Sequence, residues 1–341
     1  MPVGTAPTVV WNPNVEVFML LANLTDQGPK FVPRAVSAMR RAAMLKFDGH
    51  RRSVAVVETG KLMQDGFWLD ALCELGLAAD ALPKAGFTYD LPLETARRAA
   101  GGDEDDGFAR LEQYLEYAAA FTLDTGALDF LKLQAEAYRA GAAELEAALG
   151  DGHWSEAIDL YFGSSHRSVM HVASLLLPAG YGFGFALPTP GGPMAFQVTA
   201  PFIKPDGKLA FADPEQAVLA AERDLIRAFV RPIVVQGRLL ARPFVHAFHR
   251  SRDVFRRLGY EDALTCLEDR LVHGIHGRLL TRRGEAPVAE SLVRFDEEAG
   301  DRFARLIAEA LEDFETHRTD FPTLDAFFPH LIEYVAGDEG K

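Results

Sequence analysis

Cysteine is scarce in this sequence, because only Cys73 and Cys266 occur among 341 residues and they form no CxxC pair. A disulfide framework or a thiolate zinc site needs more cysteines at closer spacing, so neither is supported, and the usage suits a reducing compartment. The GxSxG turn of many serine hydrolases and the Walker-type phosphate loop are also absent. The chain therefore lacks the local signatures of these nucleophile and nucleotide sites.

Long apolar runs and an excess of basic charge are missing as well. The most apolar run, 172–188, contains Pro178 and three glycines, so it cannot form a continuous membrane-spanning helix. The formal net charge of −14 disfavours nucleic-acid binding through counterion release. No basic residue precedes the apolar run 18–24, as a secretory signal requires. We expect a cytoplasmic chain with neither nucleic acid nor a membrane as partner; a processed form of a longer chain could be secreted or periplasmic.

The sequence is rich in apolar residues, and most of them have the spacing of helices. Its hydrophobic content of 48% is ample for a large core. Helical spacing of apolar residues dominates 1–160, whereas 168–203 holds β-prone pieces separated by Gly and Pro, with TPGGP (189–193) as a hairpin connection. No linker or internal repeat divides the chain. We predict one α+β domain over 1–341, mainly helical in 1–160, with a small antiparallel sheet and further helices in 161–341.

The clearest helix start in the chain is at Asp213. This residue can act as N-cap, Pro214 suits the first turn, and Glu215 lies near the positive end of the helix dipole. The helix is predicted to run to Gln236, to pack against the sheet, and to kink or end at Pro232. Further helices are predicted at roughly 238–258, 262–281 and 286–318.

The same helix carries Arg227 and Arg231, four residues apart. Residues at this spacing lie on one face of a helix, and metalloenzymes often place two histidines in this way. Why an apolar helix holds two guanidinium groups on one face is therefore a question about function.

Six segments, taken in order, resemble an uncharacterised bacterial family of proposed zinc metallopeptidases, domain of unknown function 4932. The segments are NPNVEVFMLL, YFGSSHRSVMHVASLLLPAGYGFG, MAFQVTAPF, DLIRAFVRPIVVQ, LEDRLVHGIHGRLL and THRTDFPTLDAFFPHLIEYV. They are distributed between residues 12 and 335, over most of the length of the chain. The resemblance implies a zincin-like fold in which a helix with an HEXXH motif binds zinc and activates a water molecule.

The resemblance also implies that this chemistry has been lost. The positions that match the motif read Arg227, Ala228 and Arg231, while Asp269, with Glu268 beside it, matches the position of a third ligand. Arginine cannot lose its proton to bind a metal, and alanine offers no general base. The implied protein is a pseudoenzyme that needs no cofactor and binds a peptide, a protein or a small anionic ligand.

Two arrangements of the arginines are compatible with the sequence. In the first, Arg227 and Arg231 fill the space of the lost metal and pair with Asp269 or Glu268. In the second, both point to solvent and lay their stems along the apolar stripe.

A rival hypothesis is an active metal-dependent hydrolase or peptidase that uses the histidines and acids of 246–276 and binds zinc through His246, His249, His273 and His276. Each pair is spaced three residues apart on a predicted helix, so each could share a metal. Helical projection, however, places all four histidines away from the apolar stripes of their helices. A purely scaffolding protein is the third hypothesis.

Overall fold

The computed structural model describes residues 7–31, 36–100, 104–164, 168–190, 192–260 and 262–337. The chain folds into two compact units whose segments alternate along the sequence. The first unit comprises Met1–Gly152 and Arg167–Ala221, and the second comprises His153–His166 and Glu222–Lys341. Because the chain passes from the first unit to the second twice, no single linker marks the division in the sequence.

The first unit begins with a short strand, β1 (Thr8–Val10), and a helix, α1 (Pro13–Leu24). Asn12 caps α1, because its Oδ1 accepts from the backbone N–H groups of Asn14 (2.9 Å) and Val15 (3.1 Å). The remaining helices are η1 (Gly28–Phe31), α2 (Ala38–Phe47), η2 (Asp48–His50), α3 (Val54–Gln64), α4 (Leu69–Ala78), α5 (Leu93–Ala100), α6 (Glu104–Thr125), α7 (Ala127–Leu133) and α8 (Ala135–Leu149). The first part of the chain is therefore mainly helical, as predicted.

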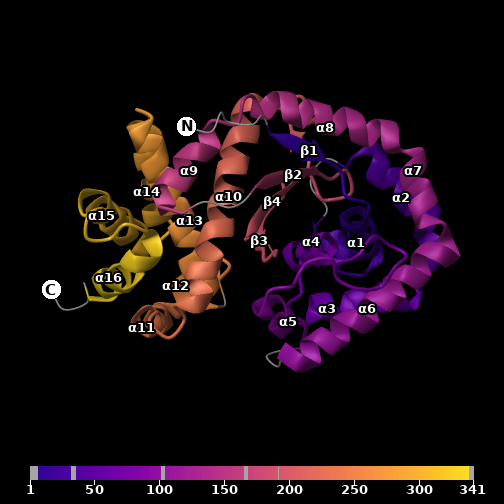
Figure 1. The fold of residues 1–341 in the computed structure, drawn as a ribbon, viewed down its shortest axis with the longest axis horizontal. Coiled ribbons are helices and arrows are strands. Elements are labelled where there is room, and N and C mark those ends of the chain that lie inside the picture. Colours follow the sequence, from indigo (N-terminus) through magenta and orange to yellow (C-terminus); the bar gives the residue numbers. More distant parts are fainter. Residues whose placement is uncertain are drawn as a thin grey trace. The chain divides into compact units, whose positions relative to one another are not determined.

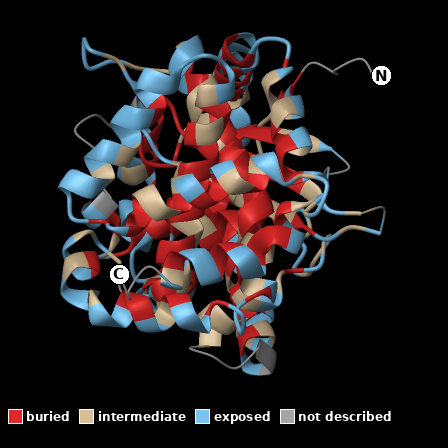
Figure 2. Ribbon diagram, turned by 90° about the vertical axis from the view of Figure 1, so that its left-hand side faces the viewer, coloured by how far each residue is buried: buried red, intermediate tan, exposed pale blue. Residues whose placement is uncertain are grey.

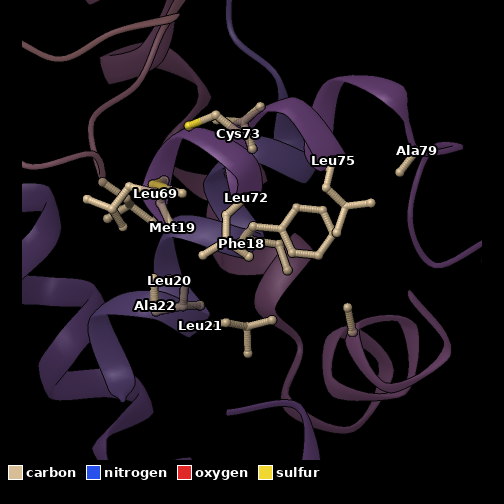
Figure 3. Packing of buried hydrophobic residues seen from close by; sticks show 14 of the residues in the cluster. Phe18, Met19, Leu20, Leu21, Ala22, Leu69, Leu72, Cys73, Leu75 and Ala79 are labelled. Atoms are coloured by element: carbon tan, nitrogen blue, oxygen red, sulfur yellow. The ribbon is translucent and has the colours of Figure 1, made fainter. Parts of the chain in front are cut away.

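Helix α1 lies at the centre of the first unit. Every one of its residues after Pro13 is buried, which explains why its sequence shows no polar face. Figure 3 shows Phe18 and Met19 of α1 packed against Leu72 and Leu75 of α4. Helices α6, α7 and α8 follow one another around the outside of this core (Figure 1).

The sheet of the first unit has the strand order β1-β2-β4-β3, where β2 is Val169–Ala173, β3 is Gly182–Leu187 and β4 is Met194–Thr199. Strands β3 and β4 are antiparallel, and TPGGP connects them as predicted. A two-stranded antiparallel ribbon, β5 (Phe202–Ile203) and β6 (Leu209–Ala210), follows. However, β2 is parallel to both β1 and β4, so the four-stranded sheet is mixed where an antiparallel one was predicted.

The helices that pack most extensively on this sheet are α8, which contacts β1 and β2, and α4, which contacts β3. The sequence analysis predicted that the helix from Asp213 to Gln236 packs against the sheet, but α8 and α4 make the most extensive contacts with it. All residues of β4 from Ala195 to Thr199 are buried, because helices and loops cover the strand on both faces.

The second unit consists of helices. They are α9 (Trp154–Phe162), α10 (Pro214–Gln236, with its first eight residues in the first unit), α11 (Arg242–Arg250), α12 (Arg252–Arg257), α13 (Ala263–Arg282), α14 (Ala286–Glu298), α15 (Phe303–Thr316) and α16 (Leu324–Gly337). Helix α13 packs against α11, α14 and α15. Rings of Phe244, Phe248, Phe255 and Phe303 stack in its core with centroids 4.6–5.2 Å apart. Figure 2 shows how buried residues line the inner sides of the helices.

Helix α10 has the predicted bounds: Asp213 caps it, since Asp213 Oδ1 accepts from Gln216 N at 3.1 Å, and the helix continues through Pro232 to Gln236 instead of ending at the proline. Two other predicted helices in this part of the chain are each divided in the structure. The predicted helix 238–258 divides at Ser251 into α11 and α12. The predicted helix 286–318 divides at Gly300, whose φ of 95° suits glycine alone.

None of the helices in the described ranges is both long and apolar enough to cross a membrane.

Candidate functional site

The two arginines of α10 pair with two carboxylates of α13. Arg227 Nε lies 3.3 Å from Glu268 Oε1, and Arg231 Nε lies 3.3 Å from Glu268 Oε2. Arg227 Nη2 also donates to Asp269 Oδ1. One carboxylate thus bridges two guanidinium groups, and a second carboxylate holds one of them. Of the two arrangements that the sequence left open, pairing with Asp269 and Glu268 is the one present.

These charged side chains are mostly withdrawn from water. The exposed fractions are 18% for Arg227, 24% for Arg231, 13% for Glu268 and 27% for Asp269. Ala228, in contrast, is 1% exposed and forms part of the apolar side of α10. Removing charges from water costs free energy. In this cluster the cost is offset because each charged group has a neighbour of opposite charge and is hydrogen-bonded to it.

Local sequence explains why the four residues meet. Arg227 and Arg231 share one face of α10, since one turn of helix separates them. On α13, whose N-cap Asp262 accepts from Thr265 N at 2.7 Å, Glu268 and Asp269 are adjacent and diverge by about 100° around the helix axis. Both still reach α10 because arginine side chains are long and carry several donors.

The pairing changes the protonation chemistry of the cluster. Burial would raise the pKa of Asp269, but the charge of Arg227 and the hydrogen bonds from Tyr260 and Arg227 hold that pKa below its ordinary value. Burial would lower the pKa of Arg227, but Asp269, Glu268 and Asp224 raise it above its ordinary value. Both shifts favour the charged forms, so the two partners remain ionised.

The cluster continues through Tyr260 to a third arginine, Arg270. Tyr260 Oη donates to Asp269 Oδ2 at 2.9 Å and accepts from Arg270 Nη2 at 2.6 Å. Arg270 also lies 2.8 Å from Asp296 and 3.2 Å from Asp301, through its Nη1 and Nε atoms. Asp301 is fully buried, and burial raises its pKa above its ordinary value despite the charge of Arg270.

A further ion-paired group joins the early part of α10 to the end of α13. Arg283 donates to both carboxylate oxygens of Glu222, with 3.0 Å between Nη2 and Oε2. His276 Nε2 lies 3.4 Å from the same Oε2. Only 2% of the Glu222 side chain is exposed. Arg283 and His276 therefore replace the water that would otherwise stabilise this carboxylate.

The four histidines of the rival hypothesis do not converge. His246 and His249 are exposed on α11, whereas His273 faces Asp296 (3.5 Å) and His276 faces Glu222. Across the described ranges, no group of three or more His, Cys, Asp or Glu side chains could hold a metal ion. The projection that placed His276 away from the core was wrong, because this residue is buried against α10.

Two further histidines lie in the middle of the chain. His166, which the sequence placed beside several serines, lies outside the described residues. His171 is buried in β2, where its Nδ1 is 2.9 Å from Gln197 Oε1 of β4.

Sequence reasoning missed Asp224, whose side chain is fully buried on α10. Its carboxylate lies 3.3 Å from Arg223 Nη2, and its charge contributes to the raised pKa of Arg227. The available signal was the placement of an acid between Arg223 and Arg227, at the three-residue spacing that favours contact with the second of these arginines.

The first unit holds a buried acid of a different kind. Glu16 of α1 is fully buried, and its Oε2 accepts from Tyr138 Oη (2.6 Å) and from Leu176 N (3.1 Å). Burial raises its pKa to about 7, although hydrogen bonds from Ser174, Tyr138 and Leu176 oppose the rise. No sequence pattern distinguishes this glutamate from other acids near helix starts.

A pocket of about 380 Å³ opens in the first unit near the start of α1. Its lining includes Trp11, Asn14, Tyr89, Leu128 and Lys132. None of its lining residues was a predicted site residue, so the pocket and the ion-paired cluster are separate features.

The chain matches one protein-family model, described as Domain of unknown function (DUF4932), over residues 34–334. The chain belongs to this family. The match includes α10 and α13, so the ion-paired arginines lie within the DUF4932 domain. Neither a curated protein nor a solved structure matches the chain.

Proposed function

We propose that this DUF4932 protein is a catalytically degenerate, metallopeptidase-like protein with a binding or scaffolding role. In this proposal, ion pairs between α10 and α13 take the place that the resemblance assigns to a zinc site. The observation that supports it is the bridge from Glu268 to both Arg227 and Arg231, at 3.3 Å on each side.

The residues of the cluster do not fit a zinc ion. Glu268 and Asp269 are the only two of the four that offer ligand atoms, and both already accept from guanidinium groups. Two positive charges beside them oppose a divalent cation, and zinc sites in proteins are usually completed by histidine or cysteine.

The cluster also lacks a group that could activate water. Ala228 is an apolar, buried residue, and the carboxylate of Asp269 is held in its charged form by Arg227 and Tyr260. A general base must be free to take up a proton near neutral pH. A carboxylate whose pKa is lowered by its partners does so only under acidic conditions.

Arg227 and Arg231 are poorly suited to bind a small anion, because both are already ion-paired with carboxylates of α13. A free carboxylate would have to displace Glu268 or Asp269, which are tethered and already oriented. The geometry therefore favours a stable scaffold that joins α10 to α13 over capture of a small anionic ligand by these arginines.

Zinc uptake by designed histidine variants tests the proposal. In Arg227→His/Arg231→His, two imidazoles face Glu268 and Asp269, so we expect about one tightly held zinc per chain by elemental analysis after dialysis. The wild-type chain should retain none. Adding Ala228→Glu completes the motif, but it introduces a carboxylate at a buried position, so the double variant is the primary test.

A matched control separates a preformed site from any histidine pair. Arg252 and Arg256 are exposed and spaced four residues apart on α12. Arg252→His/Arg256→His should bind zinc at least tenfold more weakly, because neither arginine is ion-paired with a carboxylate of the described residues, so no third ligand is already in place. Retention of about one zinc per chain by the wild type would overturn the proposal. Equal affinities of the two folded double variants would show that the cluster does not occupy the position of a metal site.

A further inference from the structure

The segment from Arg238 to Arg257 concentrates positive charge in an acidic protein. Among its twenty residues, the only acid is Asp253 and lysine is absent. It contains six arginines, at positions 238, 242, 250, 252, 256 and 257, and two histidines, at positions 246 and 249. The whole chain carries a net charge of −14, so this segment has the opposite charge to the protein as a whole. Contacts with a partner depend on the charges within a Debye length of about 10 Å, which here are mainly positive.

The structure leaves these arginines facing water. All six are exposed, as are His246 and His249, while the apolar side chains of α11 and α12 point inward. Arg238, Arg242, Arg252, Arg256 and Arg257 have no ion-pair partner within the described part of the chain. Five other arginines of the second unit do have ion-pair partners, namely Arg227, Arg270, Arg278, Arg283 and Arg305.

A seventh arginine adds to the same region. Arg302 donates to the backbone oxygen of Ala247 in α11 at 3.2 Å. Burial and the positive charge of nearby Arg250 lower the pKa of Arg302 below its ordinary value. Arg302 thus adds a further positive charge beside α11.

Two adjacent leucines protrude beside the arginines. Leu239 is 66% exposed and Leu240 is 52% exposed, in the turn between α10 and α11. The turn is closed by hydrogen bonds to Gly237 O from Leu240 N (2.9 Å) and Ala241 N (3.0 Å). Gly237 packs so closely on Phe328 of α16 that no Cβ would fit, so the turn presents the leucines from a fixed base.

We propose that this arginine face, made of Arg238, Leu239, Leu240, Arg242, Arg250, Arg252, Arg256 and Arg257, docks on a membrane surface that contains acidic phospholipids. Guanidinium groups bind phosphate in a bidentate manner, and a lipid headgroup layer presents many phosphates on one plane. Protruding leucines find an apolar environment just below that layer. Such peripheral docking needs no membrane-spanning helix.

Other polyanions fit the face less well. Single-stranded nucleic acid is bound by stacking on exposed aromatic rings, whereas Phe244, Phe248 and Phe255 of these helices are fully buried. A phosphate backbone also offers nothing to two exposed leucines. An acidic peptide would pair with the arginines, since arginine clusters recognise acidic motifs, but it would give the two projecting leucines no apolar environment.

Co-sedimentation of the full chain with vesicles tests the proposal. We expect binding to vesicles of phosphatidylcholine with phosphatidylserine, no binding to phosphatidylcholine alone, and weakening by salt. Arg252→Glu/Arg256→Glu/Arg257→Glu should lower the partition coefficient at least tenfold. Leu239→Ser/Leu240→Ser should lower it several-fold while leaving all of the charge in place.

The control reverses three exposed arginines of the first unit, in Arg41→Glu/Arg52→Glu/Arg139→Glu, with the same change in net charge. Equal losses in the control and the α12 variant would overturn the proposal, because only overall charge would then matter. The proposal also fails if duplex DNA or polyglutamate binds as tightly as vesicles and the leucine variant binds normally. Circular dichroism of each variant confirms that it is folded.

Discussion

Glu16 in the first unit and Asp269 in the second show two ways of placing a carboxylate inside a protein. Asp269 lies beside Arg227 and Tyr260, which hold its pKa below the ordinary value. Glu16 is fully buried among neutral donors, Tyr138 Oη, the Ser174 side chain and Leu176 N, and its pKa is raised to about 7. A charged partner therefore outweighs the cost of burial, whereas neutral hydrogen bonds only reduce it.

The two sites consequently respond to pH in opposite directions. The folded pKa of Asp269 is depressed, so its contribution to stability is present above the ordinary value of 3.8 and is lost as pH falls below it. The folded pKa of Glu16 is raised, so its contribution is full below 4.5 and is lost as pH rises toward about 7. Stability contributed by the two sites together is greatest in mildly acidic solution.

The largest effect is expected from removing the charged partner, in Arg227→Met. Asp269 would lose its ion pair and Glu268 one of two, which leaves carboxylates mostly withdrawn from water without compensation. We expect a loss of about 3–4 kcal/mol in the free energy of unfolding at pH 7, from chemical denaturation. The loss should shrink near pH 4, where the orphaned carboxylates become protonated.

The matched control is Arg252→Met, which removes an exposed arginine with no ion-pair partner among the described residues. A change within about 0.5 kcal/mol is expected for it. If Arg227→Met cost no more than this control, the ion pairs would be dispensable and the comparison between the two sites would fail.

The sequence predicted the paired site better than the neutral one. The charges and the spacing of two arginines one helical turn apart, and of two adjacent acids, can be read directly from the sequence. Their pairing could therefore be proposed before the fold was known. Glu16 looks like an ordinary acid in the first turn of a helix, a position that favours acids at any depth. Its hydrogen-bond partners, Tyr138 of α8 and the backbone N–H of Leu176, are more than a hundred residues away along the chain.

The same distinction between local and distant determinants applies to the fold. The helix start at Asp213 and the hairpin at TPGGP depend on neighbouring residues, and both were predicted. Parallel pairing of β2 with β1 was not, because its register joins Thr8 to Met170. No local pattern encodes a contact between residues so far apart.

A second effect, of nearly the same size, is expected from Glu16→Gln. The pKa difference between about 7 in the folded state and 4.5 in the unfolded state corresponds to about 3–4 kcal/mol, at about 1.4 kcal/mol per unit. The wild type should lose this stability between pH 4.5 and 7, whereas the variant, which cannot ionise, should not. Denaturant midpoints measured across this range test the difference, with exposed Glu112→Gln as control. Parallel pH profiles of Glu16→Gln and wild type would show that Glu16 does not titrate in this range.

The smallest effect is expected from Tyr138→Phe, which removes one neutral donor from Glu16 but keeps the ring stacked on Trp11 at 4.6 Å. The hydrogen bond lowers the pKa of Glu16, so its loss should move the pH-dependent decrease in stability to higher pH. We expect a cost of about 1 kcal/mol at pH 5, where Glu16 is neutral, and about 2 kcal/mol at pH 9, where the hydroxyl donates to a charged acceptor. A cost that is equal at both pH values, or that persists undiminished in a Glu16→Gln background, would place the contribution of Tyr138 in its ring contacts. The growth of the cost with pH is thus the measurement that distinguishes a donor to a titrating carboxylate from a residue that only packs.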